Sequence, residues 1–310
     1  MSGITKAYAR ALFAICLAIS SRCPASSIGD DYQKFLKAVE DSASDDSLQR
    51  SQRISKIYAA LFPGVSDARL RQLSVADVEK LFDAAKVAEL YSKGSAALNQ
   101  MQAYYAALER TGTPSVSKQN DLYGALIDQR RFQDATNFAQ RNHLKFEVIP
   151  RSPPAPARDA APFSYLQLRG ERLVFRQFHP SGSSVIVIAS PLCPFTLRAA
   201  MAIELDQPVQ KALAKHSIWI IPEERDLHIA ALRKWNAQHP SMSMSLVYHR
   251  RDWPLITWWE TPVFYFILDG KLKRAVIGWP GQKQLQQLKA GLSELHLLSK
   301  RDSSAPATRP

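Results

Sequence analysis

The feature that most constrains the fold of this chain is a proline-rich segment near its middle. Residues 151–162 (RSPPAPARDAAP) contain four prolines and no sustained hydrophobic periodicity, which is typical of an extended and semi-rigid linker. All six tryptophans of the 310-residue chain lie beyond this segment, which indicates a change of architecture. We predict a two-domain α+β protein, with an all-α helical bundle over residues 26–150 and an α/β domain over residues 163–299.

Residues 28 to 148 show the spacing of apolar residues that is typical of amphipathic helices. For example, Ser74 with Asp77 three residues later predicts an N-cap ahead of an apolar helical face. The last helical pair of this region resembles half of a tetratricopeptide unit, although no clean repeat of about 34 residues is present. Two interpretations therefore remain, an ordinary helical bundle and a helical array that binds a protein partner.

The first 25 residues have the organisation of a secretory signal peptide. A basic start precedes nine apolar residues, 11–19 (ALFAICLAI), which fit the apolar region of a signal and are too few for a transmembrane helix. Small residues suit a cut after Ala25, which would remove Cys16 and Cys23. We therefore predict a periplasmic or secreted protein of the bacterial envelope with no transmembrane span in its mature chain. An ordinary amphipathic first helix is the alternative.

Composition narrows the classes of function. The chain carries 40 Lys and Arg against 28 Asp and Glu, a formal net charge of +12, which favours anionic partners. The basic residues are spread along the chain rather than clustered, so nucleic acid is not a predicted partner. No phosphate-binding loop is present and the histidines lack metal-ligand spacing, so we predict no cofactor and no metal. Glu223, Glu224 and Asp226, which follow a predicted strand, are interpreted as the solvated start of a helix.

The second half of the chain alternates strand and helix patterns. Residues 185–189 (VIVIA) form a continuous apolar run, which indicates a strand buried on both faces. Asp269-Gly270 between two apolar runs predicts a hairpin, and residues 300–310 are predicted to be a disordered tail. The expected elements, in order, are strands at 165–168, 173–178 and 185–189, a helix at 197–216, a strand at 218–221, a helix at 223–237, strands at 263–268 and 273–277, and a helix at 282–298.

Two short motifs lie within this pattern. The first follows the buried strand and contains Cys193 and Pro194, and the second is Thr261-Pro262, about 70 residues further along. These motifs and the order of the elements resemble the thioredoxin fold, and locally the bacterial periplasmic disulfide isomerase family (DsbC/DsbG), over residues 163–298. The resemblance implies that Pro262 is cis, that its loop faces Cys193, and that this loop pairs with an extended peptide.

Cys193 has the surroundings of a reactive thiol. At a helix N-terminus, the helix dipole and the free backbone N–H groups favour the thiolate, which is a nucleophile toward disulfides. The sequence Cys193-Pro194-Phe195-Thr196 departs from the family pattern, because Thr196 stands where the family has its second cysteine. A threonine cannot attack a disulfide, although its hydroxyl could hydrogen-bond the thiolate. Catalytic roles are therefore predicted for Cys193 and Thr196, with a buried and inert thiol as the alternative.

These features lead to three hypotheses for function. The first is an exported factor for envelope assembly or folding, which binds unfolded or extended polypeptide, including envelope proteins, at the cis-proline loop. The second is a monothiol thiol–disulfide oxidoreductase that needs an external resolving thiol. The third is a non-catalytic helical scaffold, and whether the protein is an enzyme stays open. The first hypothesis predicts peptide contacts at Pro194, Phe195, Trp259, Thr261 and Pro262.

Overall fold

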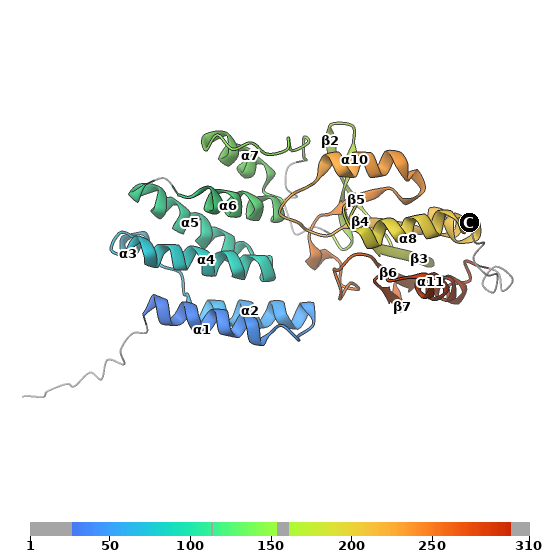
Figure 1. Ribbon diagram of the computed structural model, residues 1–310, viewed down its shortest axis with the longest axis horizontal. Helices are drawn as coiled ribbons and strands as arrows, with labels where there is room; N and C mark the ends of the chain where they lie inside the picture. Colours follow the sequence, from blue (N-terminus) through green and yellow to red (C-terminus); the bar gives the residue numbers. More distant parts are fainter. Residues whose placement is uncertain (1–26, 113, 154–160, 299–310) are drawn as a thin grey trace, which may run out of the picture.

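The computed structural model describes residues 27–112, 114–153 and 161–298. The predicted signal peptide at residues 1–25 and the predicted tail at 300–310 lie outside these ranges, as do residues 154–160 of the predicted linker. The described part of the chain forms a helical stack followed by a seven-stranded sheet with its own helices, and the two lie side by side (Figure 1). The predicted fold class, an all-α domain followed by an α/β domain, is confirmed.

The first half of the described chain is helical, as its periodicity predicts. Its helices are α1 (Ile28–Asp41), α2 (Ser47–Leu61), α3 (Asp67–Leu70), α4 (Val75–Ser92), α5 (Ser95–Thr111), α6 (Val116–Asp128) and α7 (Phe132–Arg141). Ser74 caps α4 as predicted, because its Oγ accepts a hydrogen bond from the Asp77 N–H at 3.2 Å. Successive helices pack on one another, α2 on α4, α4 on α5 and α6 on α7, which gives the layered stack seen in Figure 1.

The second half builds one mixed sheet. Its strands are β1 (Ser164–Arg169), β2 (Arg172–Gln177), β3 (Ser183–Ile188), β4 (Ser217–Ile221), β5 (Met244–Val247), β6 (Val263–Leu268) and β7 (Lys271–Ile277). They lie in the order β2-β1-β5-β4-β3-β6-β7. Strands β3, β4 and β5 are parallel, whereas β6 is antiparallel to both β3 and β7. The carboxyl ends of β3, β4 and β5 and the start of β6 therefore meet at one edge of the sheet.

The helices of the second half complete a thioredoxin-like fold. They are α8 (Pro194–Glu204), α9 (Gln207–His216), α10 (Ile229–Gln238) and α11 (Gln282–Glu294), with two short 3₁₀ helices, η1 (Pro240–Met242) and η2 (Arg250–Asp252). The topology of that fold is present in one part of the sheet, where the strands lie in the order β4-β3-β6-β7. Along the chain, α8 and α9 lie between β3 and β4, and α11 follows β7. Alternate residues of β3 belong to two different cores, which explains its continuous apolar run.

Three elements differ from the expectation. The predicted helix at 197–216 is two helices, because Asp206 caps α9 by accepting the Val209 N–H at 3.3 Å. The predicted helix at 223–237 begins only with α10, because Glu223 is buried in a cluster of charges rather than solvated. Strand β5 was not among the expected elements; it has only four residues (MSLV), and all four are buried.

Polar side chains hold the helical stack against the sheet. Arg130, in the turn between α6 and α7, is buried, and its guanidinium donates to the carbonyls of Val247 at 2.7 Å and of Tyr248 at 3.2 Å. Arg225, which follows β4, donates to the buried carboxylate of Glu89 in α4 at 2.8 Å. Because Val247 is the last residue of β5, Arg130 ties the carboxyl edge of the sheet to the stack.

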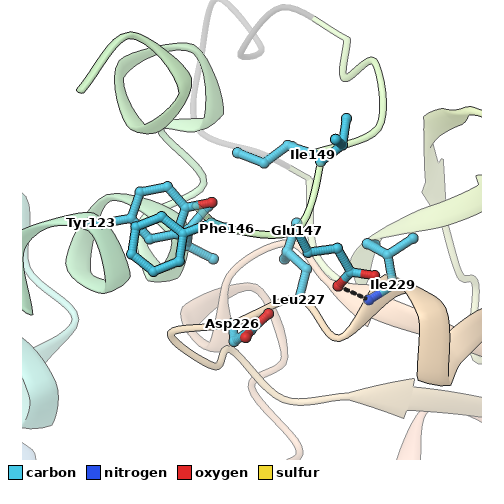
Figure 2. A pocket seen from close by; sticks show the side chains of 9 residues that line it. Tyr123, Phe146, Glu147, Ile149, Asp226, Leu227 and Ile229 are labelled. Atoms are coloured by element: carbon cyan, nitrogen blue, oxygen red, sulfur yellow. Dashed lines mark hydrogen bonds between the residues drawn. The ribbon is translucent and has the colours of Figure 1, made fainter. Parts of the chain in front are cut away.

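A second connection joins the segment after α7 to α10. Glu147 accepts the backbone N–H groups of Ile229 at 2.7 Å and Ala230 at 2.6 Å, so it caps α10 from a distant part of the chain (Figure 2). The stacked rings of Tyr123 and Phe146, with centroids 3.7 Å apart, lie beside it. The pocket between these groups measures about 10 Å³, room for about one water molecule, so this seam is a packing contact rather than a ligand site.

Candidate functional site

Cys193 occupies the N-cap of α8, directly after the loop that leaves β3. Its backbone is extended (φ −79°, ψ 119°) and Pro194 takes a position in the first turn, where the missing N–H of proline leaves no helical hydrogen bond unmade. The Cys193 N–H donates to the Ser190 carbonyl at 3.1 Å, which closes the loop. The thiol is partly exposed, so another molecule can reach it.

Strand β6 brings a distant segment to this thiol. Ile188 pairs with Val263 in antiparallel register, so the residues just before β6 lie beside the loop that carries Cys193. The Thr261–Pro262 peptide bond is cis, and the Cys193 thiol donates to the Thr261 carbonyl at 3.3 Å. We call Cys193, Thr261 and Pro262 the thiol–proline site.

The hydrogen bonds that the Cys193 sulfur accepts favour the thiolate. Partial burial alone would raise the pKa of Cys193, but hydrogen bonds from the side chains of Thr261 and Thr196 and from the backbone N–H groups of Thr196 and Phe195 outweigh it. The pKa of Cys193 therefore lies below its ordinary value. The backbone donors belong to the first turn of α8, whose dipole also favours a negative charge.

Thr196 lies where a second thiol would complete a pair. Its side chain is buried, accepts the Ser190 N–H at 3.5 Å, and is within hydrogen-bonding reach of the Cys193 sulfur. Cys193 is the one cysteine in the part of the chain that the structure describes. The site can therefore form a mixed disulfide, but no second thiol lies near it among the described residues to resolve that bond.

Large apolar side chains are exposed around the thiol–proline site. Leu192, Phe195 and Trp258 are 56%, 42% and 39% exposed, and each lies within three residues of Cys193 or Thr261 along the chain. Exposed apolar side chains beside a partly exposed thiol are candidate contacts for another molecule. Because these side chains lie near the backbone at the start of β6, the surface suits an extended segment of another polypeptide.

The structure separates two predicted contact residues from the others, and the first is Pro262, which is buried. Pro194 and Phe195 are exposed in the first turn of α8, next to the thiol. Trp259 is half-buried instead, and the Arg250 guanidinium lies 5.3 Å from its ring centroid. Its side chain lines a cleft between the helical stack and the sheet, and the exposed Trp258 is not part of that lining.

A buried charge cluster at the same edge of the sheet was missed by sequence reasoning. Glu223 follows β4 and is 2% exposed. It contacts His249 Nδ1 at 2.9 Å and accepts the Arg250 N–H at 3.0 Å. Burial alone would raise the pKa of Glu223, but the His249 hydrogen bond and the charges of Arg130, His249 and Arg250 hold it below its ordinary value. The interpretation of Glu223 as a solvated residue is wrong; its place directly after a buried strand was the signal available in the sequence.

No family model matches the chain, and no curated protein is significantly similar to it. Among solved structures, a thioredoxin-like protein from Bacteroides caccae is similar at 10% sequence identity and a TM-score of 0.31, over 94% of this chain and 99% of that chain. At this identity and TM-score, the likeness does not indicate a function. The thioredoxin-like fold is supported instead by the strand order and the geometry of the site. Within the described residues, no helix is long and apolar enough to cross a membrane, and no group of His, Cys, Asp or Glu side chains is placed to hold a metal ion.

Proposed function

We propose that this protein binds extended polypeptide at the thiol–proline site and acts as an exported factor for the assembly or folding of envelope proteins. The observation that carries the proposal is the 3.3 Å contact between Cys193 Sγ and the Thr261 carbonyl, with exposed apolar side chains beside it. Residues 259–261 precede β6 and pair with no described strand, so a peptide could add there by backbone hydrogen bonds. The first 25 residues support export, and the local resemblance to the DsbC/DsbG family supports a polypeptide client.

The lowered pKa of Cys193 favours a second candidate, a monothiol thiol–disulfide oxidoreductase. In this reaction the Cys193 thiolate attacks one sulfur of a client disulfide, the client S–S bond breaks, and the other client sulfur leaves as a thiolate. Because Thr196 carries no sulfur, an external thiolate must then attack the client sulfur of the mixed disulfide. That step joins the external thiol to the client and releases Cys193 as a thiolate.

The thiol itself provides the test of this second candidate. We expect the rate of iodoacetamide alkylation of Cys193 to reach half of its maximum at a lower pH than that of a cysteine in a short unstructured peptide, because its hydrogen bonds favour the thiolate and lower its pKa. Mass-spectrometric quantification of the peptide that contains Cys193 follows this residue alone. A midpoint at or above that of the unstructured peptide would exclude an activated thiol and leave peptide binding as the favoured function.

Removal of the exposed rings should weaken polypeptide binding. We expect Trp258→Ala and Phe195→Ala each to lower the affinity for a reduced and carboxymethylated unfolded polypeptide by about three- to eightfold, since complete burial of such a side chain contributes ~1.5–3 kcal/mol and only about 40% of each residue is exposed. The loop itself should be retained, because the Trp258 backbone N–H donates to the Tyr265 hydroxyl at 2.7 Å. Fluorescence anisotropy of the labelled polypeptide measures the Kd.

Val116→Ala supplies the matched control for these two variants. Val116 is 66% exposed and lies in α6, on the helical stack, so its truncation should leave the Kd unchanged. A variant that carries both Trp258→Ala and Phe195→Ala and still binds as tightly as the wild type would show that polypeptide does not bind at the thiol–proline site.

A further inference from the structure

Three arginines lie side by side at one end of the β1–β2 hairpin. Arg169 and Arg172 are directly opposite each other in the antiparallel register, and Arg151 forms a β-bridge with Arg172. The backbone of Arg151 is fixed there, because its N–H donates to the Glu171 carbonyl at 3.1 Å and its carbonyl accepts the Leu173 N–H at 2.7 Å. Neighbouring strands lie about 5 Å apart, and residues paired across them have their side chains on the same face.

A fourth arginine, Arg176, extends this face along β2. It follows Arg172 by four residues, so the alternation of side chains in a strand places both on one face, about 14 Å apart. The residues between them that point the other way, Leu173 and Phe175, pack in the core or against it. The four arginines are all exposed. We call them the arginine patch: Arg151, Arg169, Arg172 and Arg176.

The hairpin supplies no free carboxylate to the arginine patch. Glu171 is the only acidic residue in residues 164–177, and its carboxylate is paired with Arg233 of α10 at 2.6 Å. Among the described residues, no ion pair reaches the four guanidinium groups, and their one hydrogen bond is the one that Arg169 donates to Gln167 Oε1 at 3.0 Å. Like charges directly opposite each other destabilise a sheet, so the stability of the hairpin does not account for this arrangement.

The make-up of the arginine patch favours a surface of phosphate groups. Guanidinium groups bind phosphate through paired hydrogen bonds. A stable protein interface also needs an apolar core, whereas Val174, the apolar residue of this face of β2, is already half-buried. Single-stranded nucleic acid needs exposed rings on which bases stack, and the rings of the hairpin, Tyr165 and Phe175, are half-buried too. The headgroups of an anionic membrane need neither, because each basic side chain near them is attracted separately.

We propose that the arginine patch binds the phosphate headgroups of an anionic membrane and thereby holds the protein at the membrane surface. The patch lies at the β2 edge of the sheet (Figure 1). Three strands, β1, β5 and β4, separate β2 from β3, and Cys193 follows β3. Contact with a membrane through the patch therefore leaves the thiol–proline site uncovered, and the proposal does not depend on the proposed function.

Sedimentation with vesicles tests the proposal. The mature chain, residues 26–310, is mixed at low ionic strength with vesicles of phosphatidylglycerol and phosphatidylcholine, or of phosphatidylcholine alone. We expect binding to the anionic vesicles only, and weaker binding as the salt concentration rises, because salt screens the charges. The combined variant Arg151→Gln, Arg172→Gln and Arg176→Gln should lower the partition coefficient by about 100-fold, since each arginine at such a surface contributes about fivefold (~1 kcal/mol).

A matched control removes the same net charge elsewhere. Lys37→Gln, Lys56→Gln and Arg69→Gln, combined in one variant, lie at exposed positions on α1, α2 and α3, and this variant should bind almost as tightly as the wild type. Lysine at the three patch positions keeps the charge and should retain most of the binding. The glutamine variant of the patch should melt no lower than the wild type, because it removes like charges that face each other.

Four results would overturn the membrane proposal. Equal binding to the two kinds of vesicle would show that anionic headgroups are not recognised. Equal losses in the patch and control variants would show that net charge alone attracts the protein. A lower melting temperature of the glutamine variant would give the arginines a structural role. Binding of a DNA duplex through the patch, without binding to anionic vesicles, would assign nucleic acid as the partner. None of these results changes the outcome of the polypeptide titrations that test the thiol–proline site.

Discussion

A Thr196→Cys variant is expected to reduce insulin disulfides about tenfold faster or more than the wild-type chain, with dithiothreitol as the reductant. The side chain at position 196 is within reach of the Cys193 sulfur in the first turn of the same helix, so a thiol there would attack the mixed disulfide within the molecule. Intramolecular groups in good orientation act at effective concentrations far above those of a free thiol. The appearance of turbidity from the insulin B chain measures the rate.

The matched control is Thr196→Ser, which keeps a hydroxyl at the same position. It should show no gain in insulin reduction, because oxygen cannot resolve a mixed disulfide. A folded Thr196→Cys variant with the same rate as the wild type would contradict the assignment of position 196 as the missing half of a cysteine pair.

Replacement of Arg130 should cause the largest loss of stability. Arg130→Met keeps most of the side-chain length but removes the guanidinium that donates to the Val247 and Tyr248 carbonyls. It also removes a positive charge that stabilises the buried Glu223 carboxylate. Loss of one partner from a buried group of charges typically costs about 3–5 kcal/mol. We expect a loss of this size in the free energy of unfolding.

Urea denaturation followed by tryptophan fluorescence measures this loss in the second domain, because all six tryptophans lie there. Arg274→Met is the control: Arg274 pairs with Glu294 at 2.9 Å on an exposed face of the same domain, and an exposed pair of this kind contributes ~1 kcal/mol or less. Equal and small losses for the two variants would show that Arg130 does not hold the sheet edge against the helical stack.

The parts of the fold that local sequence determines were predictable. The continuous apolar run of β3, the serine that caps α4 and the Cys193-Pro194 start of α8 each depend on residues close together in the chain. The two halves of the thiol–proline site were also predictable, because Cys193 and Thr261-Pro262 each belong to a short motif. Their contact spans 68 positions, and only the order of the elements between them indicated it.

The interdomain contacts were not predictable in the same way. Arg130 follows an ordinary helix, and its bond to Val247 spans 117 positions, so nothing near it in the sequence distinguishes it from an exposed arginine. Glu147 caps α10 across 82 positions, for the same reason. Trp259 was expected beside the thiol, but its side chain lines the cleft between the helical stack and the sheet instead. These side chains acquire their roles from tertiary packing rather than from a local pattern.

Unfolded polypeptide should protect Cys193 from alkylation if it binds at the thiol–proline site. The measurement compares the iodoacetamide rate at Cys193, quantified by mass spectrometry, with and without a saturating amount of a reduced and carboxymethylated unfolded polypeptide. Saturation is verified by anisotropy in the same buffer. We expect the rate to fall by about tenfold, because a peptide over the Thr261 carbonyl covers the sulfur that lies 3.3 Å from it. An unchanged rate with the polypeptide fully bound would contradict binding at this site.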